Sequence, residues 1–131
     1  MPTPPDLRSE RGTAAVEFAL VLPLVLVVAL ALVQTGLLVR DRLLVEAAAR
    51  AGARAAAVQE DVSSIRTAAL GAAPSLDGGA IDLGVDRVGA RGEPVTVSIR
   101  YLTSVRVPFV GWLFGGSVAM TTASTARQEF G

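Results

Sequence analysis

One uncharged stretch dominates the sequence and limits what the chain can fold into. Residues 18–39 contain no Asp, Glu, Lys or Arg, and Gln34 and Thr35 are their only clearly polar side chains. As an α-helix these 22 residues extend about 33 Å, which matches a bilayer hydrocarbon core of about 30 Å. The 91 residues that follow Arg40 are too few to bury such a helix on every side. The stretch therefore predicts a membrane-spanning helix, with the lipid bilayer as its partner.

Composition and charge exclude most other classes of protein. The chain of 131 residues is 51% hydrophobic and 18% charged, which argues against disorder. Its 12 basic residues, all arginine, balance 12 acidic ones, so no basic surface for nucleic acid is expected. The absence of Cys and His excludes disulfides, Cys/His zinc sites and catalysis by thiol or imidazole. We therefore expect no enzyme activity, no metal, no cofactor and no nucleic-acid partner.

The segments that flank the apolar stretch say little about its orientation. Residues 1–12 contain three prolines and four charges, so we expect an irregular, polar leader. Arginines lie on both sides of the stretch, so the positive-inside rule favours neither orientation clearly. Pro23 lies inside the stretch and predicts a bend or a packing position, because proline removes a backbone hydrogen bond.

A cleaved secretory signal is an alternative reading of the same stretch. Residues 29–31 (Ala-Leu-Ala) fit a small-x-small cleavage pattern, which predicts a soluble mature chain that begins near Leu32. Two observations oppose this reading: the apolar run continues to Val39, and the acidic Glu17 stands at its start.

Glu17 is the most informative residue, because a carboxylate at the edge of a spanning helix is costly and needs compensation. An acid in the first turn of a helix, stabilised by the helix dipole, is the plain structural explanation. The surrounding run of residues 11–18, RGTAAVEF, resembles the type IV prepilin processing site. This resemblance implies that prepilin peptidase cuts after Gly12, that Thr13 becomes the new N-terminus, and that Glu17 with Phe18 sets subunit register.

A longer pattern resembles one branch of this class. RGTAAVEFALVLPLVLVVALALVQTG, followed by LLVEAAARAGARAAA, is similar to the TadE-like family of minor pseudopilins from tight-adherence (Flp-type IVb) pilus systems. The similarity covers residues 11–57. It implies a single-pass protein of the bacterial inner membrane with a cytoplasmic leader and an extracytoplasmic C-terminal domain. It also implies other pilins or pseudopilins and inner-membrane assembly proteins as partners.

Residues 40–70 favour helix throughout, with no proline and with Gly52 as the one strong helix-weakening residue. We expect the spanning helix to continue out of the membrane through this segment. Ala48, Gly52 and Ala56 recur every four positions, which permits close approach to another helix or to a sheet. Alanine-rich composition also produces such spacings by chance.

The remaining sequence changes from helical to strand periodicity. Residues 71–79 form a turn cluster, and apolar side chains then alternate with polar ones over residues 81–86 and 95–101. Residues 89–94 suit a hairpin loop, and residues 117–126 form a third strand. We therefore expect an α+β membrane protein with four segments: a leader at 1–12, a transmembrane helix at 13–39, an extracytoplasmic helix at 40–70, and a domain at 71–131 with a three-stranded antiparallel sheet packed on the helix.

Three of the six aromatic residues, Phe109, Trp112 and Phe114, lie within six positions. A plug at the end of the sheet core is the plain explanation for this group. Contact with another subunit or with the membrane interface is the alternative.

In a second functional alternative, the protein is anchored in the membrane but is not part of a pilus. In that reading the protein is a single-pass envelope protein whose domain binds another partner. It predicts an uncut chain at Gly12 and tolerance of Glu17→Ala.

Overall fold

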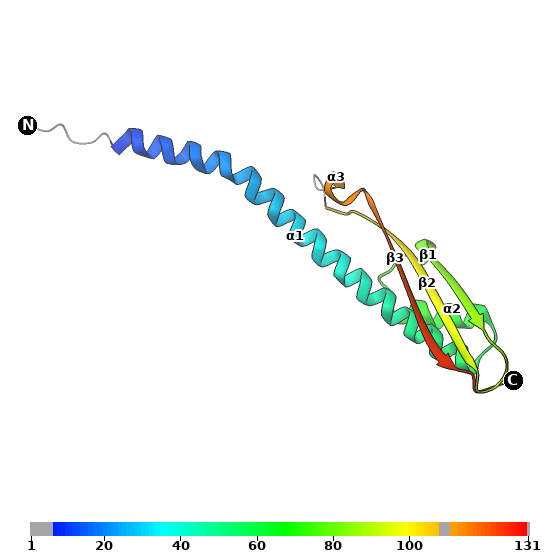
Figure 1. Cartoon of the computed structure of the whole chain (residues 1–131). Helices are drawn as coiled ribbons and strands as arrows, with labels where there is room; N and C mark the ends of the chain where they lie inside the picture. The colour runs from blue at the N-terminus through cyan, green and yellow to red at the C-terminus, as the bar shows by residue number, and fades with distance from the viewer. Residues whose placement is uncertain (1–6, 108–110, 131) are drawn as a thin grey trace, which may run out of the picture.

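The computed structural model describes residues 7–107 and 111–130, and Figure 1 shows a long helix with a small α/β unit at one end. The elements in chain order are α1 (Leu7–Val58), α2 (Val62–Gly71), the 3-10 helix η1 (Gly78–Ala80), β1 (Ile81–Arg87), β2 (Pro94–Ser104), α3 (Gly111–Phe114) and β3 (Ser117–Arg127). The sheet and α2 lie along the C-terminal half of α1, and the N-terminal half of α1 extends away from them (Figure 1). We call the unit formed by α1 from residue 45 onward, α2, η1 and the sheet the head.

Helix α1 is a single element of 52 residues. It begins at Leu7, so the expectation of an irregular leader is wrong for residues 7–12, which are helical. The physical reason is that residues 6–22 contain no proline and only Gly12 as a strong helix breaker. Pro23 lies inside α1 without ending it, and Figure 1 shows α1 as one gently curved helix.

The second correction concerns the helix expected over residues 40–70, which is two helices. Helix α1 ends at Val58, and Asp61 is the N-cap of α2. The Asp61 carboxylate accepts hydrogen bonds from the backbone N–H groups of Ser63 and Ser64 at 3.4 and 2.9 Å and from both hydroxyls at 2.6 and 2.7 Å. These bonds, the Ser63 hydroxyl first, lower the pKa of Asp61 from 3.8 to about 2. An aspartate with serines two and three positions after it is a local N-cap signal, so this break is visible in the sequence.

The sheet has the order β1-β2-β3 with antiparallel pairing throughout, which confirms the predicted three-stranded sheet. Ile81 pairs with Tyr101 at one end of β1, and Ser104 pairs with Ser117 at the α3 end of the β2–β3 hairpin. Burial alternates along β2, so one face of the sheet is covered and the other faces solvent.

The main cluster of buried apolar side chains lies within the head. Buried β-branched side chains of β2 pack against alanines of α1, so the strand supplies volume and the helix supplies a flat surface. Helix α2 contributes Ile65 and Ala69 to the same core. The principal members are Val45, Ala48, Ala49, Ala53, Ala56, Ile65, Ala69, Val95, Val97, Ile99 and Tyr101.

Candidate functional site

The N-terminal half of α1 contains a long, continuous exposed range. Every residue from 12 to 29 is exposed, and we call this range the bare segment. Phe18 is 68% exposed and Leu20 is 75% exposed, although both are large and apolar. Soluble monomers rarely expose a continuous apolar surface of this extent. Among the described residues, one helix is long and apolar enough to cross a membrane, and its range is Gly12–Val58.

The predicted processing residues lie at the start of the bare segment. Gly12 and Thr13 are exposed within α1, so the sequence-predicted cleavage position is helical here. A Cβ atom added at Gly12 would meet no atom within 4 Å. Substitution at Gly12 therefore does not disturb packing within the described structure.

Glu17 and Phe18 follow one turn later and are both exposed. The four ion pairs formed by described residues do not include Glu17. An exposed carboxylate in an otherwise apolar segment is thus available to a group on another molecule. Pro23, one and a half turns further along, is also exposed in the bare segment.

The three small residues spaced by four positions have a different environment. Ala48 and Ala56 are fully buried, and Gly52 is also buried. A Cβ atom at Gly52 would lie 3.1 Å from Cγ1 of Val97 in β2, so the helix approaches the sheet closely at this point. In this structure the three residues pack inside the head.

A cluster of polar residues joins α1 to the β2–β3 connection, and sequence reasoning did not single it out. The Thr103 hydroxyl and Nη2 of Arg106 each donate to Oδ2 of Asp41 at 3.0 Å. The backbone N–H groups of Arg106 and Val107 donate to Oε1 of Gln34 at 3.2 and 3.1 Å. Gln34 is 1% exposed and Asp41 is 2% exposed.

We call Gln34, Asp41, Thr103 and Arg106 the polar cluster. The Asp41 carboxylate forms ion pairs with Arg106 at 3.0 Å and with Arg40 at 3.8 Å, but its buried Oδ1 accepts no hydrogen bond. The available sequence signal was the spacing of seven between Gln34 and Asp41, which places both on one face of a helix.

The aromatic group is only partly described. Trp112 in α3 is 77% exposed, so it does not plug the sheet core. Phe109 lies outside the described residues, and for Phe114 the structure describes the backbone alone, at the end of α3.

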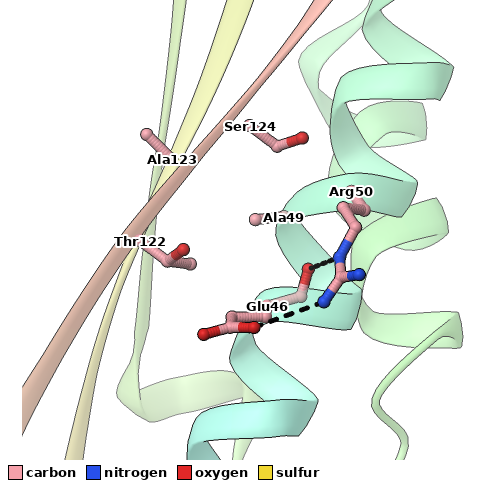
Figure 2. Close-up of a pocket in the computed structure, with 6 residues that line it drawn as sticks. All are labelled: Glu46, Ala49, Arg50, Thr122, Ala123 and Ser124. Atoms are coloured by element: carbon pink, nitrogen blue, oxygen red, sulfur yellow. Dashed lines mark hydrogen bonds and ion pairs between the residues drawn. The ribbon is translucent and has the colours of Figure 1, made fainter.

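A shallow groove of about 400 Å³ lies between α1 and β3 (Figure 2). Its lining residues are Glu46, Ala49, Arg50, Thr122, Ala123 and Ser124. The Glu46 carboxylate pairs with Arg50 at 3.3 Å and with Arg42 at 3.0 Å, so its charge is already compensated. No group of three or more potential metal ligands occurs among the described residues. The groove is therefore lined by a compensated ion pair and small side chains.

Comparison with known proteins gives a family match within helix α1. Residues 12–54 match the family model described as TadE-like protein. The match begins at Gly12, includes the bare segment, Gln34 and Asp41, and ends before α2. No curated protein and no solved structure matches the chain. The resemblance predicted from the sequence is thus confirmed over residues 12–54.

Proposed function

We propose that this protein is a minor pseudopilin of a tight-adherence (Flp/type IVb) pilus. The observation that carries the proposal is the bare segment of α1 attached to a folded head, within a TadE-like segment. The bare segment is stored in the bacterial inner membrane and then packs beside the helices of other pilins during assembly. The head remains outside the membrane and supplies the specific contacts.

The physical basis of this assembly is an exchange of surroundings. In the bilayer the apolar side chains of residues 12–29 contact lipid, and in a fibre they contact apolar side chains of neighbouring helices. Lipid and helix surfaces are similarly apolar, so burial alone favours neither state strongly. Shape and charge must therefore determine the axial register of one helix against its neighbour. We assign the charge part of this role to Glu17.

Prepilin peptidase processing supplies the charge that Glu17 needs. Cleavage after Gly12 creates an α-ammonium group on Thr13, whose ordinary pKa of about 7.7–8.0 leaves it largely protonated at neutral pH. The Glu17 carboxylate of one subunit pairs with that ammonium group on its neighbour, because each is costly in an apolar environment without a partner. Phe18 packs beside this pair. The pairing fixes the axial position of one helix against the next.

The proposed orientation places residues 1–12 in the cytoplasm and the head outside it. This part of the proposal rests on the resemblance, because arginines flank the apolar stretch on both sides. The partners are then prepilin peptidase, other pilins or pseudopilins, and inner-membrane assembly proteins.

The test is mass mapping of the N-terminus of the protein expressed in its native host, beside a Gly12→Asp variant. We expect the native chain to begin at Thr13 and the variant to remain uncut. Gly71→Asp is the matched control, because Gly71 is also exposed with no atom within 4 Å of an added Cβ, and it should be processed normally.

Other outcomes would favour the alternatives. An intact Met1 terminus in the native chain, with Glu17→Ala tolerated, would support a single-pass envelope protein outside any pilus. A soluble chain that begins near Leu32 would support a secreted protein with a cleaved signal.

A further inference from the structure

The connection between β2 and β3 lies beside the apolar stretch of α1. The backbone N–H groups of Arg106 and Val107 both donate to the side chain of Gln34. Gln34 precedes Arg40, the first charged residue after the stretch, by six positions, or about 9 Å of helix. Val107 therefore lies beside the apolar stretch, on the N-terminal side of the charged part of α1.

The hairpin formed by β2 and β3 runs toward the bare segment. Thr103 contacts Asp41, and Val107, four residues later, contacts Gln34, seven residues earlier in α1. Strand β2 thus runs toward the N-terminal end of α1 as it approaches α3. Figure 1 shows α3 at the end of the hairpin that faces the N-terminal half of α1.

The composition of this connection suits an apolar environment. Residues 111–116, GWLFGG, contain no charged side chain, and we call them the tip. The Trp112 side chain is 77% exposed, so the head does not cover it. Tryptophan is enriched at membrane interfaces, where its ring contacts apolar matter and its indole N–H contacts water or headgroups.

The charged groups of α1 and of the hairpin begin at the same level. Arg40 and Arg42 flank Asp41 in α1, and the Arg106 guanidinium extends back from the tip to Asp41 at 3.0 Å. Long basic side chains commonly reach from an apolar layer to the interface in this way. Both elements therefore change from charged to apolar at one plane, which is the pattern expected at a headgroup layer.

We propose that the tip is a second membrane-binding site, in which α3 and Trp112 insert into the headgroup layer of a phospholipid bilayer on the side that carries the head. This proposal rests on the membrane span of the proposed function, because α1 must cross the bilayer to bring the tip to its surface. Two contacts, α1 and the tip, fix how the head is tilted and rotated on the membrane. Assembly into a fibre then requires the tip to leave the bilayer together with α1.

The chain contains one tryptophan, so Trp112 is an intrinsic probe of this site. The experiment places the full-length protein in phosphatidylcholine/phosphatidylglycerol vesicles whose acyl chains carry bromine either near the headgroup or near the chain end. We expect Trp112 emission to shift to shorter wavelength and to lose most of its intensity. The loss should be greater with bromine near the headgroup than with bromine near the chain end.

Two variants in a Trp112→Phe background provide the controls. Leu24→Trp places the probe in the bare segment, and deep bromine should quench it most. Val88→Trp places the probe in the exposed β1–β2 loop, and neither lipid should quench it.

The controls separate failure of the tip from failure of the span. Quenching of Leu24→Trp without quenching of Trp112 overturns the tip proposal and leaves the span intact. If Leu24→Trp is also unquenched, the span fails, and the tip proposal fails with it. A Trp112 emission shift that depends on protein concentration and not on brominated lipid indicates a contact between subunits and overturns the proposal.

Discussion

Replacing Thr103 by valine removes one hydroxyl from the contact between β2 and α1 and leaves the side-chain volume almost unchanged. The Thr103 hydroxyl donates to the Asp41 carboxylate at 3.0 Å, and these side chains are 3% and 2% exposed. A hydrogen bond to a charged group contributes about 1.5–3 kcal/mol to stability. Thr103→Val leaves Asp41 with Arg106 as its remaining hydrogen-bond donor, because Oδ1 already accepts none. We therefore expect the free energy of unfolding to fall by about 1.5–3 kcal/mol.

The assay is urea unfolding of the full chain in detergent micelles, followed by far-ultraviolet circular dichroism. Thr125→Val is the matched control, because the Thr125 hydroxyl bonds to Thr96 at 2.9 Å on the exposed face of the sheet. That substitution should change stability by less than about 0.5 kcal/mol. Equal effects of Thr103→Val and Thr125→Val would refute the argument that burial and charge strengthen the Asp41 contact.

Three further predictions follow from particular contacts. Gly52→Val should lower the free energy of unfolding by about 1–3 kcal/mol through overpacking, because the added Cβ lies 3.1 Å from Val97; Gly36→Val, with no atom within 4 Å, is the control in the same urea assay. The pKa of Asp61 is lowered from 3.8 to about 2, so its stabilisation of α2 is fully present above about pH 4 and is lost as the pH falls toward 2. Amide hydrogen exchange in α2 should show this loss, and an Asp61→Asn variant should not. Glu17→Ala should reduce incorporation into sheared surface fibres by more than about tenfold, because it removes one partner of the proposed buried pair, while urea unfolding of the head stays unchanged; normal incorporation would argue against the register role.

The sequence was sufficient for the features that depend on local pattern. The uncharged length of residues 18–39 predicts the spanning helix, and alternation over residues 81–86 and 95–101 predicts two strands that the structure contains. The third strand and the antiparallel order were also predicted correctly. Each of these depends on hydrophobicity over a short window, which does not require knowledge of distant residues.

Two local expectations were wrong for local reasons. Residues 7–12 were expected to be irregular because residues 1–12 contain three prolines, yet these precede Leu7 and leave the following turns free to form helix. The helix expected over residues 40–70 is broken because Asp61 satisfies the first N–H groups of a new helix. Helix propensity alone does not detect a break without glycine or proline.

For the candidate site too, some features were predictable from the sequence and others required the fold. Gly12, Thr13, Glu17 and Phe18 were found from a short motif, and the structure adds that all four are exposed. Their roles in processing and register remain predictions, because they concern contacts with other molecules. The environment of Gly52 required the fold, since the spacing of small residues is equally compatible with a neighbouring subunit and with the chain's own sheet.

By itself, the sequence determined that this chain has a helix fit to span a membrane and a small antiparallel sheet. Tertiary structure decided how these parts are joined: the polar cluster links residues 62 to 73 positions apart, Thr103 to Asp41 and Val107 to Gln34. It also decided that Trp112 stays exposed at the end of the hairpin that faces the apolar half of α1. The physical reason is that hydrophobicity and its periodicity are read from neighbouring residues, whereas these hydrogen bonds depend on the register between a strand and a helix, which a local pattern does not encode.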